Sequence, residues 1–320
     1  MQRTGLTRRL VMAGGLAATP ALTMAAPAPG YEILASGLQF PEGPVPMADD
    51  SVIFCEILAK RLGRWRPGGK VETVVEFPTG APNGASLGPD GALYICNNGG
   101  RPPAYAGGAL QRLDLATRTL KTLYTASSDG PLVGPNDLVF DEWGDIWFTD
   151  MGRTLPRSQE LGGLYWAKAD GSEIRQIAYP IAAPNGVALG PDRRTLYLVQ
   201  TFQRQVHSLR IEGRGKVAQA DGKAALKGLA GLPGLANCDS MAVEANGNLL
   251  IANWQEGVSV LSPEGRLIGR RSFAPYNVTN LAFGPDMRTL YLTANAPDGG
   301  VLLRARWPRP GLRLLSRPLV

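Results

Sequence analysis

A unit of two short apolar runs joined by a polar turn recurs along the chain. In its clearest copy, from Gly134 to Gly152, the runs Leu138–Phe140 and Ile146–Phe148 flank a turn that contains Gly144. Two such runs predict a β-hairpin. Six copies, the first of them degenerate, recur at roughly 40 to 55 residues, which is the period of a propeller with one four-stranded blade per copy. The sequence therefore predicts an all-β, six-bladed β-propeller.

Each copy begins with an oxygen-bearing side chain just before the strand that we expect to be innermost. In a propeller, equivalent positions of successive blades converge on the central channel. Asn and Asp also favour turns, so one such residue alone would predict only a turn. Six in register, one of them a glutamate, favour a shared site on the channel axis. The six residues are Glu42, Asn83, Asn136, Asn185, Asp239 and Asn280.

The segments between the copies are expected to supply the outer strands of the blades. Gly163–Ala167 and Glu173–Ile177 are examples, each a strand-like run beside a Gly or Asp turn. After residue 30 no window longer than a turn or two has helical periodicity. Residues 29–320 are enough to bury a sizeable core, so we expect them to form a single propeller.

The first 28 residues predict an export signal that is removed. Thr7-Arg8-Arg9-Leu10 resembles a twin-arginine motif, and an Ala- and Gly-rich apolar run follows to Ala26. The run is short and interrupted by Gly and Pro, which argues against a permanent membrane span. A chance Arg-Arg pair before an ordinary signal peptide is the alternative. Both interpretations predict an exported protein, periplasmic or secreted, and the first implies transient contact with the twin-arginine export machinery.

The charge distribution argues against a nucleic-acid partner. The formal charge of +6 falls to +3 without Arg3, Arg8 and Arg9 of the predicted signal. The rest of the chain has no clustered basic stripe with interleaved aromatic residues, which is the usual footprint of nucleic-acid binding.

The cysteines and the single histidine give no sign of an active site. Cys55, Cys96 and Cys238 lie in or beside predicted inner strands without zinc-ligand spacing, so we interpret them as small buried apolar residues. His207 lies in an alternating strand and is expected to be away from the axis. One histidine allows no multi-histidine metal site, and no other is available for a Ser-His-Asp triad.

The loop from Gly99 to Gly108 is long for a hairpin connection. It contains Arg101, Pro102, Pro103 and Tyr105 and is expected either to cover one mouth of the channel or to be a plain surface loop. We include Arg101 among the candidate substrate-binding residues.

Four motifs in order carry a resemblance to a known family, and the resemblance covers about residues 35–300. The resemblance is to the senescence marker protein / gluconolactonase / luciferin-regenerating enzyme family of six-bladed propellers. The motifs are Phe40-Pro41-Glu42-Gly43-Pro44, Pro135-Asn136-Asp137 with Trp147-Phe148-Thr149-Asp150, Pro184-Asn185-Gly186, and Asp239-Ser240-Met241-Ala242-Val243.

The resemblance implies one divalent cation at the channel axis, with Ca²⁺ favoured and Mn²⁺, Zn²⁺ or Mg²⁺ as alternatives. Carried over by motif, Glu42, Asn185 and Asp239 would be direct ligands, and Asn136 would bind the metal or the substrate at the same centre. Oxygen ligands suit hard cations, and two carboxylates balance a 2+ charge. The candidate substrate-binding residues are Asn136, Asn83, Asn280 and Arg101.

Two positions depart from the family pattern, and both concern the substrate. Some members have an arginine two residues before the Asn of the Pro-Asn-Asp motif, where this chain has Gly134. Gluconolactonase-like members often have a histidine after the second-blade strand, where this chain has Cys96-Asn97-Asn98.

The implied function is metal-dependent hydrolysis of a lactone, with a sugar lactone as the expected small-molecule substrate. The cation would polarise the ester carbonyl and hold the developing oxyanion, and Asp239 would be both ligand and general base. Because a metal-bound carboxylate is a weak base, attack by a hydroxide that the cation generates is a variant.

Three alternatives use the same fold. The site could hydrolyse a phosphotriester instead, or the cation could be a structural calcium in a propeller that only binds a ligand or a protein. A condensing propeller similar to strictosidine synthase usually has no axial metal, and the ring of oxygen-bearing side chains argues against it.

Overall fold

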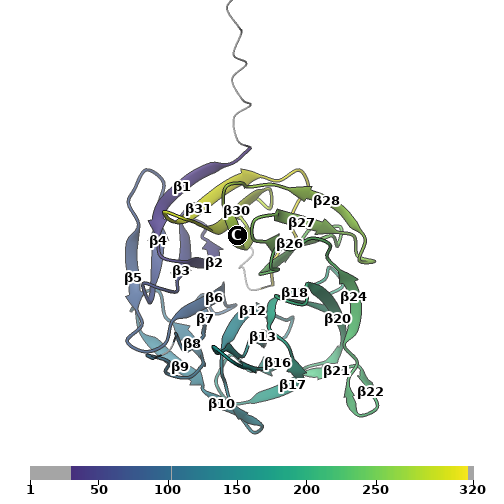
Figure 1. Cartoon of the computed structure of the whole chain (residues 1–320). Coiled ribbons are helices and arrows are strands. Elements are labelled where there is room, and N and C mark those ends of the chain that lie inside the picture. Colours follow the sequence, from purple (N-terminus) through teal and green to yellow (C-terminus); the bar gives the residue numbers. More distant parts are fainter. Residues whose placement is uncertain (1–29, 102, 316–320) are drawn as a thin grey trace, which may run out of the picture.

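A computed structural model describes residues 30–101 and 103–315. Within these residues six antiparallel sheets are arranged as blades around a central channel, as Figure 1 shows, and no helix is present. The predicted all-β, six-bladed propeller is therefore confirmed. The predicted export signal lies outside the described residues. Residues 30–101 and 103–315 contain no helix long and apolar enough to span a bilayer.

The first three blades each have four strands, with the first strand of each at the channel. The first blade comprises β2 (Pro41–Pro46), β3 (Val52–Glu56), β4 (Arg61–Trp65) and β5 (Glu72–Glu76). The second comprises β6 (Pro82–Leu87), β7 (Leu93–Asn97), β8 (Ala109–Leu113) and β9 (Leu120–Tyr124). The third comprises β12 (Pro135–Phe140), β13 (Ile146–Asp150), β16 (Gly162–Ala167) and β17 (Ile174–Ile181), which confirms the predicted outer strands.

The last three blades follow the same plan, with one extra strand in the fourth. The fourth comprises β18 (Pro184–Leu189), β19 (Thr195–Gln200), β20 (Gln205–Gly213), β24 (Lys227–Gly231) and the short β21 (Lys216–Val217). The fifth comprises β25 (Met241–Val243), β26 (Leu249–Asn253), β27 (Gly257–Leu261) and β28 (Leu267–Arg271). The sixth comprises β29 (Asn277–Phe283), β30 (Thr289–Ala296), β31 (Gly299–Arg306) and β1 (Glu32–Leu38).

Three two-stranded ribbons decorate the loops. They are β10 (Ala126–Ser127) with β11 (Gly130–Pro131), β14 (Arg153–Thr154) with β15 (Gln159–Glu160), and β22 (Gln219–Ala220) with β23 (Lys223–Ala224).

The ring is closed by strands from the two ends of the described chain. β1 pairs antiparallel with β31, so the outermost strand of the sixth blade comes from before the first blade. Figure 1 shows this pairing, with purple β1 lying along yellow β31. The repeats do not predict this pairing, because Glu32–Leu38 carries no copy of the repeated unit.

Six hydrophobic clusters hold the blades together, one at each contact between neighbouring blades. Successive residues of a strand point to opposite faces, so the inner strands of a blade supply two clusters. In β13, Ile146 and Phe148 pack toward the second blade and Trp147 packs toward the fourth. This explains the continuous apolar runs of the repeated unit, because both faces of each blade are buried.

The start of the innermost strand is irregular in five blades, with a register shift after its first residues. In the first blade, a Cβ added to Gly43 would lie 2.7 Å from the backbone oxygen of Asn83 in the next blade. Gly43 also has a φ of 47°. Glycine after the channel-facing Glu42 therefore lets the two innermost strands approach closely.

The opposite end of the channel is occupied by the C-terminal segment after β31. Leu312 N–H donates to Val243 O (2.8 Å), and Ala245 N–H donates to Pro310 O (2.9 Å). Leu312 packs against the cluster between the fourth and fifth blades, and Leu314 against the cluster between the third and fourth. The segment thus ties several blades together where the innermost strands end.

Candidate metal and active site

The six oxygen-bearing residues predicted from the repeat all lie at the beginning of the innermost strands. Each is buried, and none is more than 8% exposed. Four are the second residue of their strand, one precedes β25 by two residues, and one is the fourth residue of β29. In that order they are Glu42, Asn83, Asn136 and Asn185, then Asp239, then Asn280.

Glu42 and Asp239 form a buried pair of carboxyl groups. Burial raises the pKa of Glu42 well above its usual range, and the negative charge of Asp239 raises it further. Burial also raises the pKa of Asp239 to about 7, against hydrogen bonds from Trp254 and Asn185. None of the ion pairs within the described residues involves either carboxylate. When the pair is ionised, no cationic partner from those residues offsets its charge, and this is why burial raises both pKa values.

Asn185 presents an oxygen without a partner beside this pair. Its amide nitrogen donates to Thr201 Oγ1 (3.0 Å), which fixes the orientation of the amide. Its Oδ1 is buried and has no hydrogen-bond partner among the residues that the structure describes. An unpaired buried oxygen is costly, and such atoms are rare in folded proteins. A ligand that accepts electron pairs would satisfy it.

These donors fit a hard divalent cation. Two carboxylates and an amide oxygen are the ligand types that Ca²⁺ prefers, and a 2+ charge would offset Glu42 and Asp239. Counting only His, Cys, Asp and Glu, the described residues contain no group of three or more able to hold a metal. The fit thus depends on the amide oxygen as well as on the carboxylates.

Asn280, Asn136 and Asn83 complete the set of six oxygen-bearing residues, which we call the ring, and they differ in their contacts. Asn280 makes a hydrogen bond that lowers the pKa of Glu42, and its Oδ1 accepts from Leu281 N–H (2.7 Å), so its contacts position Glu42. The amide nitrogen of Asn136 donates to Met151 Sδ (3.6 Å). Asn83 occupies the equivalent place in the second blade, where its backbone oxygen lies against Gly43.

Asp137 and Ser240 are functional candidates that sequence reasoning missed. They follow Asn136 and Asp239 directly, at the place that Gly43 has in the first blade. Ser240 Oγ donates to Asp137 Oδ2 (2.5 Å) across the channel, and burial raises the pKa of Asp137 to about 6. The signal that could have found Asp137 is its acidic side chain at a position where the other copies have glycine, serine or leucine.

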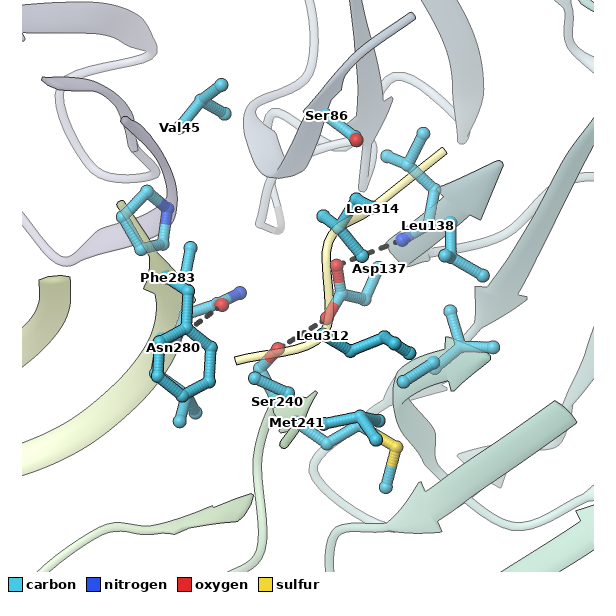
Figure 2. Close-up of a pocket in the computed structure, with 18 of the residues that line it drawn as sticks. Val45, Ser86, Asp137, Leu138, Ser240, Met241, Asn280, Phe283, Leu312 and Leu314 are labelled. Atoms are coloured by element: carbon cyan, nitrogen blue, oxygen red, sulfur yellow. Dashed lines mark hydrogen bonds between the residues drawn. The ribbon is translucent and has the colours of Figure 1, made fainter. Parts of the chain in front are cut away.

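Figure 2 shows the part of the channel where Asp137 and Ser240 meet. Asp137, Ser240 and Asn280 point toward the middle, and the C-terminal segment with Leu312 and Leu314 crosses the same space. A cavity of about 90 Å³ remains, lined otherwise by apolar residues of the innermost strands. The C-terminal segment therefore borders the channel on the side away from the strand beginnings.

Two side chains outside the ring fix its geometry. The indole N–H of Trp254 donates to Asp239 Oδ2 (2.8 Å), so Oδ1 is the oxygen of Asp239 that is free of Trp254. Thr149 Oγ1 accepts from Asp137 N–H (3.2 Å) and donates to Asn185 O (2.5 Å). Thr149 thus links the third and fourth blades directly behind the ring.

Arg101 is exposed and lies at the same end of the channel. Its guanidinium carbon is 5.6 Å from the centroid of the Phe40 ring, two residues before Glu42. Tyr105 of the same loop donates to Val133 O (2.8 Å), and Arg153 stacks over its ring at 4.0 Å. The loop from the second blade therefore contacts both neighbouring blades beside the channel mouth.

Both departures from the family pattern have a structural reason. A Cβ added to Gly134 would lie 2.4 Å from Gly152 O, so the backbone of the next loop leaves no room for an arginine. Asn97 accepts from Ala81 N–H (2.9 Å) and Gly99 N–H (3.0 Å) and donates to Gln111 Oε1 (3.0 Å). Its amide holds the neighbouring loops together.

The cysteines and the histidine lie as expected. Cys55, Cys96 and Cys238 are buried and unbridged, and burial raises the pKa of the Cys238 thiol to about 12. Such thiols are poor nucleophiles at neutral pH. His207 lies on β20, the third strand of its blade, where its Nε2 is hydrogen-bonded to Gln200 Oε1 (2.8 Å).

Comparison with known proteins identifies the family. Residues 40–296 match the family described as SMP-30/Gluconolactonase/LRE-like region. The chain belongs to this family. Among family relatives, the gluconolactonase of Zymomonas mobilis subsp. mobilis is 27% identical over 293 residues, which cover 82% of this chain and 78% of that protein. Lactonase drp35 of Staphylococcus saprophyticus is 26% identical over 282 residues, covering 85% and 84%.

Solved structures agree with this membership. A gluconolactonase from Xanthomonas campestris superposes with a TM-score of 0.69 at 26% identity, covering 88% of this chain and 89% of that one. Regucalcin from Agrobacterium tumefaciens, described as a calcium-binding protein, has a TM-score of 0.72 at 22% identity, with 89% and 97% covered. At that identity the second likeness supports the fold alone.

Proposed function

We propose that this protein is a lactonase that uses a divalent cation held by Glu42, Asn185 and Asp239. Membership of the family and similarity to gluconolactonases support lactone hydrolysis. The observation that carries the metal site is the buried, unpartnered Oδ1 of Asn185 beside two carboxyl groups with raised pKa values. Ca²⁺ is the favoured ion because all three donors are oxygens.

The residues of the ring would divide the work of ester hydrolysis. When bound, the cation would polarise the lactone carbonyl and offset the charge that develops on its oxygen. Asp239 would take a proton from the attacking water while the water oxygen bonds to the carbonyl carbon. The ester C–O bond of the lactone then breaks, and Asp239 returns the proton to the leaving alkoxide.

Neighbouring groups would hold the substrate and the base in place. The indole of Trp254 fixes one oxygen of Asp239, which leaves the other for the proton transfer. We assign Asn136 and Asn83 to orienting the lactone through their amides, together with Arg101 at the mouth. Asn280 supports Glu42.

The test is acid release from a panel of aldonolactones and simpler lactones, with protein stripped by a chelator and then supplied with Ca²⁺. We expect activity to disappear with the metal and to return with it. Mn²⁺, Zn²⁺ and Mg²⁺ added in turn would show which ion supports the fastest turnover.

Two results would replace this proposal. Hydrolysis of a phosphotriester such as paraoxon, without lactone hydrolysis, would assign the same site to phosphoryl chemistry. No hydrolysis of any ester, with Ca²⁺ still raising the melting temperature, would indicate a binding propeller with a structural ion.

We also propose that the protein acts in the periplasm or outside the cell. Arg8 and Arg9 precede an apolar run in the order of a twin-arginine signal. Replacing both with Lys should retain the protein in the cytoplasm, as measured by cell fractionation, and unchanged export would contradict the twin-arginine route.

A further inference from the structure

A second hollow lies beside the ring of oxygen-bearing residues, between the fifth, sixth and first blades. It has a volume of about 420 Å³, in the range of small-molecule pockets. Most of its wall is apolar, and none of the described residues that line it is charged. We call it the Trp254 pocket, and its apolar side chains are Leu38, Phe40, Leu58, Trp254, Ala296 and Pro297.

The Trp254 pocket is one side chain away from the proposed reaction centre. Trp254 lines it and also donates its indole N–H to Asp239 Oδ2 (2.8 Å). Phe40, on another wall, lies two residues before Glu42, directly before the first residue of β2. The segments that position the two carboxylates therefore also shape this pocket, so a group that projects from a lactone at the ring can reach it.

One of the loops around the pocket exposes an apolar side chain. The connections between second and third strands lie at the end where innermost strands begin, because the strands are antiparallel. Leu58, in one such loop, lines the pocket and is 51% exposed. An exposed leucine at the edge of an apolar hollow adds to the apolar surface that a ligand can cover.

A bare sugar lactone does not match this surface. Its hydroxyl groups each need a hydrogen-bond partner when they leave water, and the described lining offers only the amide side chains of Gln39, Asn277 and Asn295 beside its six apolar side chains. An alkyl chain or an aromatic ring gains instead from burial, by about fourfold in binding for each methylene group. We propose, on the basis of the lactonase function above, that the substrate is a lactone with an apolar substituent that occupies the Trp254 pocket.

The first test is a series of γ-lactones with alkyl chains of increasing length, together with gluconolactone, on the Ca²⁺-loaded protein. The value of kcat/KM should rise by about fourfold per methylene over the first carbons and then level off when the pocket is full. Equal values across the series, or gluconolactone as the best substrate, would overturn the inference.

Variants of the pocket provide the second test. Ala296→Phe fills the pocket, and it should reduce kcat/KM for a long-chain lactone at least tenfold more than for the unsubstituted ring. Leu58→Gln should reduce the same preference by about fourfold. Leu267→Gln is the matched control, because Leu267 is an exposed leucine (39%) on the outer strand β28. A Leu267→Gln effect as large as that of Leu58→Gln would contradict a specific role of the pocket.

A binding measurement separates this inference from the proposed hydrolysis. Alkyl-substituted γ-lactams resemble the substrate but resist hydrolysis, and calorimetry should show tighter binding with a longer chain and loss of that gain in Ala296→Phe. If lactam binding depends on chain length in this way while no lactone is hydrolysed, the pocket inference is supported and the lactonase proposal fails. If lactones are hydrolysed but neither turnover nor lactam binding depends on chain length, the lactonase stands and the pocket inference fails.

Discussion

Two buried carboxylates at opposite ends of the channel differ in the partners they have. Glu244, beside the C-terminal segment, accepts from Trp307 Nε1 (2.7 Å), Arg309 Nε (2.6 Å) and Asn248 Nδ2 (2.7 Å). Asp239, at the other end, accepts from Trp254 but has no cationic partner among the described residues. Glu244 thus has a cationic partner, and Asp239 has none among the described residues. The contrast fits a structural role for Glu244 and the proposed role of Asp239 in the site.

The largest effect should come from Asp239→Asn. This change removes one negative ligand and the proposed base, so kcat/KM should fall by at least a thousandfold and Ca²⁺ should no longer raise the melting temperature. The melting temperature of the metal-free protein should stay the same or rise, because a buried charge is removed. Lactone kinetics and calorimetry would measure both. Activity within tenfold of wild type would contradict the role of Asp239, and Asp129→Asn, on the exposed turn between β10 and β11, is the control.

Glu244→Gln should show the reverse pattern. It weakens the hydrogen bonds that hold Trp307 and Arg309, so stability should fall by about 1–3 kcal/mol. Arg309 is partly exposed, and solvent therefore limits the contribution of its charge. Urea unfolding would measure the loss, and kcat/KM below the unfolding transition should remain within twofold of wild type. A large loss of activity in folded protein would show that the two ends are coupled.

A smaller effect is expected in the pH dependence of stability, which should reveal the buried carboxyl of Asp239. The pKa of Asp239 is raised by burial to about 7, above its value in the unfolded chain. Its contribution to stability is therefore complete at acid pH, below the unfolded pKa, and is lost as pH rises through 7. Metal-free wild type should thus lose a few degrees of melting temperature between pH 5 and 8 relative to Asp239→Asn. Parallel profiles of the two proteins would be inconsistent with this buried carboxyl.

The smallest effect is expected for Leu314→Ala. Leu314 is partly buried at the apolar end, against the cluster of the third and fourth blades. Its truncation should cost about 1 kcal/mol, measured by urea unfolding, and leave Ca²⁺ affinity unchanged. Weaker Ca²⁺ binding would mean that the C-terminal segment also supports the ring.

The repeated unit made the blades and the ring predictable, because each copy contains an innermost strand and the residue before it. The register of the copies places all six channel-facing residues, whereas the choice of Glu42, Asn185 and Asp239 as ligands rests on the resemblance. The closure by β1 could not, because Glu32–Leu38 lacks the unit and pairs with residues far along the chain. Local patterns report local structure, whereas such pairings are decided by the finished fold.

The parts of the site that were missed depend on contacts between blades. Asp137 resembles a turn residue in the sequence, and only its hydrogen bond to Ser240 of the fifth blade shows its place in the channel. Trp254 resembles a residue at the end of a strand, and its contact with Asp239 depends on how the loop after β26 folds back. The apolar wall that it forms with Phe40 likewise combines residues from different blades.

The pairing of β1 with β31 has a consequence for synthesis on the ribosome. β1 is among the first described segments to be made, yet its hydrogen-bonding edge has no partner until the sixth blade has been translated. Earlier blades can assemble one by one as they emerge, but the circle remains open until the end of translation. The nascent chain must keep an unpaired strand edge from pairing elsewhere during that interval, when such edges are prone to aggregation.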